Sequence, residues 1–330
     1  MKKILLAAPL GDGQSGVYIY NSLVELKDVK VATFDWKNVS STSDNEELNK
    51  EFIEVHKQLE PDLTIIIKGL GITGETIKKI KEFHKGKIVG WIFDVTLGGI
   101  MVKDFKPYIE FIKKLDTFYT IDNSALPELK ELGVSAKWLS EGCFPESHKQ
   151  VTFNQHQQNQ FGADIVFLGS IGGVHPNREK ILARLDKEGF DFKIFGEVLY
   201  EPGKEPDWVK DHHTGFEAIN DYHSIACEAS KIVIGIDGWP DRSKAWSARL
   251  YRTLCAGGFY LTNYTKDLEK YFKLGEVLDV YKDEDELIEK VLFYLKNDEK
   301  RTKIAQTGMK LVNEQHTFKI RVKEIIDENI

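Results

Sequence analysis

The sequence predicts an α/β protein of two domains, each built on a doubly wound parallel sheet. The first observation behind this is that short apolar runs alternate with longer stretches of helical periodicity. The runs are apolar throughout, as expected of strands that helices cover on both faces. The second observation is that the alternation starts again after an aperiodic, glutamine-rich segment ending at residue 162. A length of 330 residues suits two domains of ordinary size.

The first domain is predicted to span residues 1–150. Apolar runs place strands in it over 4–8, 29–34, 63–67, 88–93 and 117–121. Helical periodicity fills the intervals, and helices are expected over 16–26, 46–58, 73–83 and 105–114. Strands that alternate with helices in this way pair in parallel through helical crossovers.

The second domain is predicted to follow a linker at 151–162 and to span residues 163–330. Its strands are expected over 164–168, 192–195, 232–236 and 259–261. A helix precedes the last of these strands. Ser243 or Ser247 is placed to cap this helix, and Gly257-Gly258 supplies the left-handed turn that ends it.

Composition excludes several classes of protein. Hydrophobic residues make up 42% and charged residues 29%, which is an ordinary globular balance, and no apolar run is long enough to span a bilayer. The N-terminus leads into a strand and not into a signal peptide, so we expect a cytoplasmic protein. A net charge of -7 argues against a general nucleic-acid surface. Cys143, Cys227 and Cys255 are few and widely spaced, which predicts neither a disulfide framework nor a zinc site.

Arginine is confined to the second half of the chain. The first is Arg178, and lysine carries the positive charge before it. Because arginine is the better bidentate phosphate ligand, this distribution favours a phosphate site in the second domain. Arg249 and Arg252 lie three apart near the predicted start of a helix, where the helix dipole favours anions. We therefore expect a negative group near them; the alternative is a solvated helix face.

Several motifs of the second half resemble those of the CgeB-like, group 1 type glycosyltransferases. S-x-R-x-Y runs from Ser247 to Tyr251, and G-G-F-x-L-T runs from Gly257 to Thr262. Further matches are Leu268-Glu269-x-x-Phe272, Tyr281-Lys282-Asp283, Ile304-Ala305-x-x-Gly308, Glu314-x-His316-Thr317-Phe318-x-x-Arg321, Ser230-Lys231-Ile-Val-Ile, and the run from Asp164 to Ser170 followed by Arg178. The resemblance is firm over about residues 163–325 and looser over the first half.

This resemblance implies the GT-B fold, in which two Rossmann-like domains face each other across a cleft and the final helix, about 310–328 here, packs back on the first domain. It implies a hexosyltransferase-like enzyme that moves a sugar from a nucleoside-diphosphate donor, a UDP-sugar being favoured, to an acceptor hydroxyl. The acceptor is a glycan, glycolipid, protein or small molecule. No metal and no cofactor beyond the nucleotide sugar is expected, and we expect the D-x-D-like string at Asp283 to be a helix cap.

The donor site is expected in the second domain. The turn after the first strand brings glycines that allow close backbone approach, and Arg178 opens the next helix. The loops after the second strand are placed to recognise the base, with an aromatic ring or a histidine flanking it. The predicted donor-binding residues are Gly169, Ser170, Arg178, Gly196, His213, Gly215, Phe216, Ser247, Arg249, Tyr251 and Arg252.

One position departs from the family pattern. Many relatives have a glutamate five residues before the first glycine of the helix stop, where it can bind ribose hydroxyls, and this chain has Arg252. A donor-only guanidinium cannot accept the hydrogen bonds that a carboxylate accepts. Lys244 likewise replaces an acidic residue of the wider superfamily. Asp237 and Asp241 are possible substitutes, so the ribose ligand stays open.

A catalytic base, needed if the reaction inverts the sugar's configuration, is expected on the acceptor side. Asp94 is the first choice and Asp12 the second, because both follow strands whose carboxyl ends face the crevice of a doubly wound sheet. Glu141 is a further acceptor-side candidate. The sequence does not decide between retention and inversion, and it does not name the sugar, base or acceptor.

The N-terminal loop supports a competing hypothesis. Gly11, Gly13 and Gly16 form a literal G-x-G-x-x-G after the first strand, and Asp35 ends the second strand at the distance of a ribose-binding acid. That pattern would predict an NAD-dependent oxidoreductase. Pro9 and Leu10 lengthen a turn that is tight in dinucleotide folds, and the second half lacks a hydride-transfer constellation. In the GT-B reading the loop lies on the acceptor side. A non-catalytic sugar-nucleotide or carbohydrate-binding relative is the third possibility.

Overall fold

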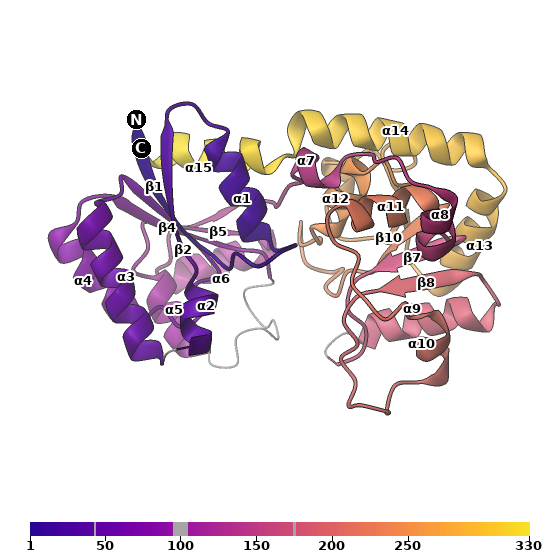
Figure 1. Ribbon diagram of the computed structural model, residues 1–330, viewed down its shortest axis with the longest axis horizontal. Helices are drawn as coiled ribbons and strands as arrows, with labels where there is room; N and C mark the ends of the chain where they lie inside the picture. Colours follow the sequence, from indigo (N-terminus) through magenta and orange to yellow (C-terminus); the bar gives the residue numbers. More distant parts are fainter. Residues whose placement is uncertain (43, 95–104, 174–175) are drawn as a thin grey trace. The chain divides into compact units, whose positions relative to one another are not determined.

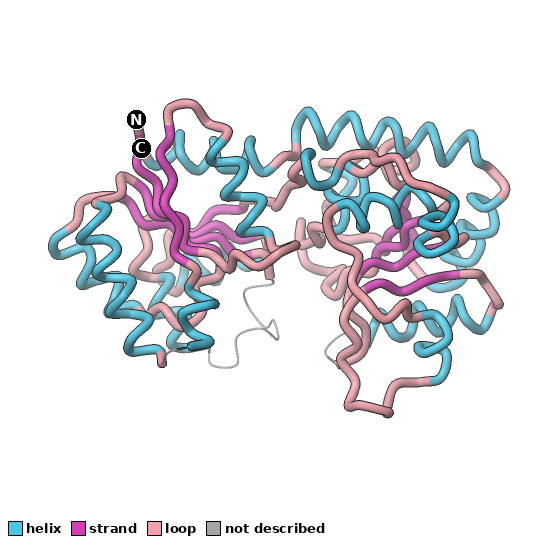
Figure 2. Tube along the Cα trace, in the orientation of Figure 1, coloured by secondary structure: helices cyan, strands magenta, loops and turns pink. Residues whose placement is uncertain are grey.

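The computed structural model describes residues 1–42, 44–94, 105–173 and 176–330, and the chain divides into two compact units. Unit 1 consists of Met1–Glu141 together with Phe318–Ile330, and unit 2 consists of Gly142–Thr317. Each unit holds a parallel sheet with helices on both of its faces (Figure 1; strands are magenta in Figure 2). Both predicted doubly wound sheets are therefore present.

The described part of unit 1 forms a six-stranded parallel sheet in the order β2-β1-β3-β4-β5-β6. The strand order reverses between β1 and β3, which is where doubly wound sheets open a crevice at the carboxyl ends of their strands. The strands are β1 Lys2–Ala7, β2 Val29–Phe34, β3 Leu63–Ile67, β4 Lys87–Ile92, β5 Thr117–Thr120 and β6 Ala136–Trp138. The helices are α1 Ser15–Val24, α2 Trp36–Thr42, α3 Asn45–Leu59, α4 Gly74–Phe83, α5 Phe105–Ile112, α6 Leu126–Glu131 and α15 Phe318–Asn329.

Burial on both faces explains why the strands of unit 1 are so apolar. On one face, the core contains Phe52 of α3, Ile77 of α4 and Phe111 of α5. On the other face, Trp91 of β4 packs edge-on against Phe318 of α15, with ring centroids 6.1 Å apart. The end of the chain thus covers the sheet formed by its beginning, and α15 lies beside α1 (Figure 1).

The described part of unit 2 forms a five-stranded parallel sheet in the order β11-β10-β9-β7-β8, so its strand order reverses between β7 and β9. The strands are β7 Ile165–Leu168, β8 Phe192–Phe195, β9 Ile232–Gly235, β10 Tyr260–Asn263 and β11 Asp279–Tyr281. The helices are α7 Pro145–His148, α8 Gln155–Phe161, α9 Pro176–Lys187, α10 Asp207–His212, α11 Asp221–Ala229, α12 Arg249–Cys255, α13 Glu284–Leu295 and α14 Asp298–Gln315.

The structure corrects two expectations about the chain's course. The segment 151–162 is not a linker: it contains α8 inside unit 2, and the units meet in sequence at Glu141–Gly142 and at Thr317–Phe318. Asn154 and Gln157 form a capping box at the start of α8. The expected helix over 310–328 is two helices, α14 and α15, which are interrupted at residues 316–317. There the His316 carbonyl accepts a hydrogen bond from the Cys143 amide, 3.0 Å away, instead of continuing the helix.

Two short strands, β6 and β11, were not predicted. Each has only three residues and lies at an edge of its sheet, so neither leaves a long apolar run in the sequence. The three cysteines are buried. Among the described residues, the helices are all too short or too polar to cross a membrane.

A buried histidine ties α3 to β3 in unit 1. The Nδ1–H of His56 donates to the Phe52 carbonyl at 2.8 Å, and its Nε2 accepts from the Thr64 hydroxyl at 2.9 Å. Burial lowers the pKa of His56 to about 4, against the opposing effect of the bond to Phe52. The folded unit therefore holds a neutral histidine well below the pH at which the unfolded chain would protonate it.

This arrangement predicts acid sensitivity. As pH falls from about 6.5 toward 4, the unfolded chain binds a proton that native His56 does not, so stability is lost on the acid side. Between pH 7 and pH 5 the loss of unfolding free energy should be about 1–2 kcal/mol smaller in His56→Gln than in the parent. Urea unfolding at both pH values measures this. His156→Gln, at an exposed position, is the control; an equal loss in parent and His56→Gln would contradict the assignment.

Candidate functional site

The candidate site lies where the strand order of unit 2 reverses. Leu168 ends β7, and Asp237 follows β9 by two residues, so both stand at the carboxyl ends of the two strands that flank the reversal. Ligands of doubly wound sheets bind in the crevice at this point. The side chains that meet here come from β7, β10, the loop after β9 and the first turns of α9 and α12.

Arg249 is the central side chain of the cluster. It begins α12 and is buried, with 8% of its surface exposed. Its Nε donates to the Leu168 carbonyl, and its guanidinium carbon lies 5.0 Å from the centroid of the Phe167 ring. Its Nη1 is buried and makes no hydrogen bond of good geometry within the described residues. A buried cationic N–H without an acceptor is costly, so the group is prepared for a ligand that accepts hydrogen bonds.

Arg178 joins Arg249 from the first turn of α9. Its Nη1 donates to the carbonyl and to the hydroxyl of Ser170, each at 2.9 Å. Its guanidinium carbon is 5.8 Å from the Phe167 centroid. Burial and the charge of Arg249 lower the pKa of Arg178 to about 9. The guanidinium stays charged at neutral pH, but the site disfavours that charge, and an anion would reverse the effect.

Asp237 is the one carboxylate whose attraction acts on both arginines in the described cluster. It is buried, and its Oδ1 accepts from the Ser247 amide at 3.3 Å. Burial raises its pKa, against the pull of Arg249, the Ser247 amide and Arg178. The buried Tyr260 hydroxyl adjoins the same charges, and burial followed by the Asp237 charge raises the pKa of Tyr260. Two cations thus face one buried carboxylate whose pKa is raised, which leaves positive charge to be neutralised.

Close packing explains why positions 169 and 196 at this edge of the sheet are glycines. A Cβ on Gly169 would lie 2.6 Å from Nη2 of Arg249, and a Cβ on Gly196 would lie 2.2 Å from the carbonyl oxygen of Gly169. The sequence suggested that these glycines admit a ligand. In the structure, Gly169 leaves room for the Arg249 guanidinium, and Gly196 lets the end of β8 lie against the Gly169–Ser170 peptide.

Several predicted donor residues make contacts within the protein. Tyr251 is buried in the core, where Trp246 Nε1 donates to its hydroxyl at 2.8 Å. Phe216 packs edge-on against Phe195, with centroids 5.4 Å apart. His213 donates through Nε2 to the Gly196 carbonyl at 2.7 Å. The Gly215 amide donates to the other ring nitrogen at 3.2 Å, so His213 and Gly215 fix the loop after α10 and border the site only through Gly196.

Arg252 follows Arg249 by three residues on α12. Burial lowers the pKa of His148 and of His223, the latter to about 3, and the charge of Arg252 adds to both shifts. Arg252 therefore acts on histidines of α7 and α11, and the charge of Arg249 also lowers the pKa of His223. The expectation that one anion serves both arginines stays a prediction.

The predicted cap of α12 is shifted. Ser247 Oγ accepts from the Arg249 amide at 3.2 Å, two residues along, but α12 begins after Ala248 and has no side-chain cap at that position. Ser243 is not a cap, because its hydroxyl bonds to the Asp267 carboxylate. Ser247 therefore links two residues of the cluster: its amide donates to the Asp237 carboxylate, and its hydroxyl accepts from the backbone amide of Arg249.

The acceptor-side candidates are all in unit 1. Asp94 follows β4, and its Oδ2 is 2.8 Å from Nζ of Lys68, which follows β3 in a left-handed backbone conformation with φ 61°. Asp12 is exposed, and its Oδ1 accepts from the Gly13 amide at 2.9 Å. Glu141 is buried, and its carbonyl accepts from Nε of Arg321 at 3.2 Å. The structure thus gives Asp94 a cationic partner at the carboxyl edge of the sheet; residues 95–104, which follow it, lie outside the described residues.

The glycine loop of unit 1 is explained by packing. A Cβ on Gly16 would lie 2.1 Å from the Pro9 carbonyl oxygen, so Gly16 lets α1 start against the end of β1, while Gly11 has no such contact and Gly13 has φ 73°. The two carboxylate oxygens of Asp35 accept from the amides of Leu10, at 3.2 Å, and Asn38, at 3.0 Å. The acid that the NAD hypothesis requires for ribose therefore ties this loop to α2.

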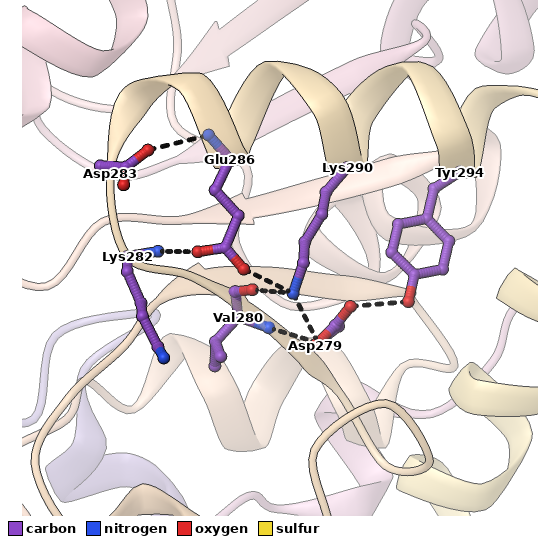
Figure 3. Close-up of polar contacts among 7 residues, drawn as sticks. All are labelled: Asp279, Val280, Lys282, Asp283, Glu286, Lys290 and Tyr294. Carbon is purple, nitrogen blue, oxygen red and sulfur yellow. Dashed lines mark hydrogen bonds and ion pairs between the residues drawn. The ribbon is translucent and has the colours of Figure 1, made fainter.

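The D-x-D-like string caps a helix, as expected. Asp283 Oδ1 accepts from the Glu286 amide at 2.9 Å at the start of α13, and Glu286 accepts from the Lys282 amide at 2.8 Å (Figure 3). Lys290 bridges Glu286 and Asp279, each at 3.1 Å. Within the described residues, the His, Cys, Asp and Glu side chains form no cluster of three that is arranged for a metal ion.

Comparison with known proteins relates this geometry to an activity. Residues 178–327 match a family model described as glycosyl transferase-like. The chain is a glycosyltransferase with the GT-B fold. Its fold is similar to that of a sucrose-phosphate synthase from Thermosynechococcus elongatus, at 10% identity, a TM-score of 0.72 and 99% coverage of both chains.

Two further solved structures have a similar fold. Anabaena HepE in complex with UDP-glucose has 9% identity, a TM-score of 0.68 and 99% coverage of both chains. A glycosyltransferase from Rickettsia africae has 9% identity and a TM-score of 0.66, with coverage of 99% of this chain and 97% of the other. No curated protein matches the sequence.

Sequence reasoning missed three residues that the structure places at or near the candidate sites. Phe167 and Tyr260 belong to buried strands, where an aromatic residue looks like any other core residue. Lys68 gave a usable signal, because it is a polar residue directly after a buried strand, the same feature that selected Asp94. In this glycosyltransferase the charged site residues could therefore be chosen from the sequence more easily than the residues that contact them in the structure.

The contact between Gly196 and Gly169 predicts a large steric effect. Gly196→Ala should destabilise unit 2 by about 2–4 kcal/mol, because a backbone carbonyl cannot move aside as a side chain can. Gly238→Ala, whose Cβ would meet no atom within 4 Å, is the matched control and should change stability by less than about 0.5 kcal/mol. Urea unfolding measures both, and equal stability of the two variants would contradict the packing described here.

Proposed function

We propose that this glycosyltransferase uses a UDP-sugar as its donor and that Arg249 and Arg178 bind the donor's diphosphate. The observation that carries the proposal is the buried Nη1 of Arg249, which makes no hydrogen bond of good geometry within the described residues. A second guanidinium lies beside it at the strand-order reversal of unit 2. Diphosphate oxygens are strong acceptors, and arginine is suited to bind them. The CgeB-like motifs, which include both arginines, support the same assignment.

The charge balance of the cluster supports an anionic ligand. Asp237 offsets one of the two guanidinium charges, and burial weakens even that contribution by raising the pKa of the carboxyl group. A diphosphate would supply the missing negative charge and accept from the N–H groups that face the crevice. The same interactions would strengthen as the bond to the sugar breaks and charge accumulates on the leaving nucleoside diphosphate.

UDP is the nucleotide we favour, and HepE, whose fold is similar, was solved in complex with UDP-glucose. We propose that binding needs no metal, because the two arginines would supply the positive charge that a metal ion could otherwise bring. Arg252 acts on His148 and His223, so we propose that it is not the ribose ligand, and that Asp237, the buried carboxylate beside Arg249 and Arg178, takes that place.

For the acceptor we propose the carboxyl edge of the unit 1 sheet, with Asp94 as the base. Asp94 is the candidate that follows a central strand and has a cation beside it, Lys68. A base must lie within hydrogen-bond reach of the hydroxyl that it deprotonates. The acceptor hydroxyl would therefore bind next to Asp94, and the reaction would invert the configuration of the sugar.

Removing Arg249 should weaken nucleotide binding. Arg249→Ala should lose about 1.5–3 kcal/mol of UDP binding free energy, the scale of a charge-assisted hydrogen bond. Calorimetry with UDP in EDTA measures this, and a repeat in magnesium tests the proposal that no metal is needed. Arg184→Ala is the matched control, because Arg184 lies on α9 like Arg178 but pairs with Glu188 and Asp285.

Three results would count against the donor proposal. Unchanged UDP affinity in Arg249→Ala would move the phosphate site elsewhere. Binding of UDP only in magnesium would show that a metal, and not the arginine pair alone, neutralises the diphosphate. Stabilisation by NAD(H) and by no nucleotide of the UDP series would return the glycine loop of unit 1 to consideration.

The base assignment gives a second functional test. Asp94→Asn should lower sugar transfer by about 10²–10⁴-fold and leave UDP affinity unchanged, because general-base catalysis contributes a factor of this size. Release of UDP from a panel of UDP-sugars, with saccharide acceptors, gives the rate. Asp12→Asn is the comparison and should have the smaller effect. A full rate in Asp94→Asn would indicate retention of configuration or a different base.

A further inference from the structure

Phe167 occupies a special position beneath the arginine pair. It belongs to β7 and is fully buried. The guanidinium carbons of Arg249 and Arg178 both lie over its ring, at 5.0 Å and 5.8 Å from the centroid. Distances below about 6 Å are those at which a cation is attracted to the negative face of an aromatic ring.

Two like charges in a buried cluster require a partner. Repulsion and desolvation both act against the cations, and Asp237 supplies one negative charge for two of them. A second carboxylate at this place would occupy the N–H groups that a ligand needs. An aromatic face attracts the cations and leaves those N–H groups free, and its attraction increases where water is excluded.

The packing around the ring fixes this arrangement. A Cβ on Gly169 would lie 3.2 Å from Cζ of Phe167 as well as 2.6 Å from Nη2 of Arg249. The ring, the guanidinium and the Gly169 backbone are therefore stacked closely, and the Leu168 carbonyl holds Nε of Arg249 from the adjacent residue. Three consecutive residues of the chain, 167–169, thus determine where Arg249 lies.

We propose that Phe167 is a positioning residue for glycosyl transfer: its ring holds both guanidiniums in place and leaves their N–H groups to the diphosphate of the donor. The inference rests on the proposed function of the arginine pair. It goes beyond that function because it assigns a role to a buried apolar side chain that would touch no substrate.

The test compares two buried phenylalanines in one core. Phe167→Leu keeps an apolar side chain and removes the ring, and Phe259→Leu does the same at a position whose ring packs against Tyr294, with centroids 4.4 Å apart. Both variants should lower the melting temperature. Only Phe167→Leu should weaken UDP binding, by about five- to thirty-fold, the scale of cation–π attraction at a desolvated site.

A double-mutant cycle separates positioning from packing. In the Arg249→Ala background one of the two cations is absent, so Phe167→Leu should weaken UDP binding by a clearly smaller factor than in the parent. An equal factor in both backgrounds would show that the ring acts on the fold and not on Arg249. Unchanged UDP affinity in Phe167→Leu, or equal losses in Phe167→Leu and Phe259→Leu, would also overturn the inference.

Failure of the inference is distinguishable from failure of the proposed function. If Arg249→Ala weakens UDP binding and Phe167→Leu does not, the arginines bind the diphosphate without help from the ring. If neither substitution changes UDP affinity, the phosphate site itself is misassigned and Phe167 has no cation to position. Each outcome is read from the same set of calorimetric titrations.

Discussion

The placement of the Arg249 guanidinium at the end of β7 is the constraint on which the rest of the site depends. The Leu168 carbonyl and the Phe167 ring hold it, and the absence of a side chain at Gly169 makes room for it. The Gly169 peptide in turn lies so close to β8 that position 196 must also be glycine. The Arg249 guanidinium therefore requires a glycine directly after β7, and the backbone of that glycine requires a second one directly after β8.

The sequence was most informative about long strands and helices and least informative about which side chains are neighbours in space. Strands β2, β3 and β8 were predicted with their observed bounds, because continuous apolar runs are what burial on two faces produces. Helix α8 was taken for a linker because its composition is polar, although Asn154 and Gln157 carried the signal of a capping box. In the sequence-based prediction the polar composition was given more weight than the capping box, although the capping box directly indicates the start of a helix.

At the site, charged residues could be chosen from the sequence, but their grouping could not. Arg249 and Arg252 share a helix of seven residues and were expected to serve one anion. Arg249 bonds to the Leu168 carbonyl of β7, Arg252 acts on His148, and the charges of both act on His223. Tyr251 matched the family motif and is a core residue. Periodicity states which face of a helix a residue occupies, but the neighbours of that face come from strands and helices distant in sequence.

The arginine cluster also shows how a site with two neighbouring cations can be stable and still attract an anion. Its electrostatic cost is limited by the Phe167 ring and by Asp237, so unit 2 folds with two cations close together. The remaining cost is relieved when an anion binds, because the ligand then gains both its own hydrogen bonds and the removal of repulsion. Full compensation by a second carboxylate would weaken the attraction for an anion, since the anion would have to displace that carboxylate. An aromatic ring is thus a partner that stabilises the cations without competing for their N–H groups.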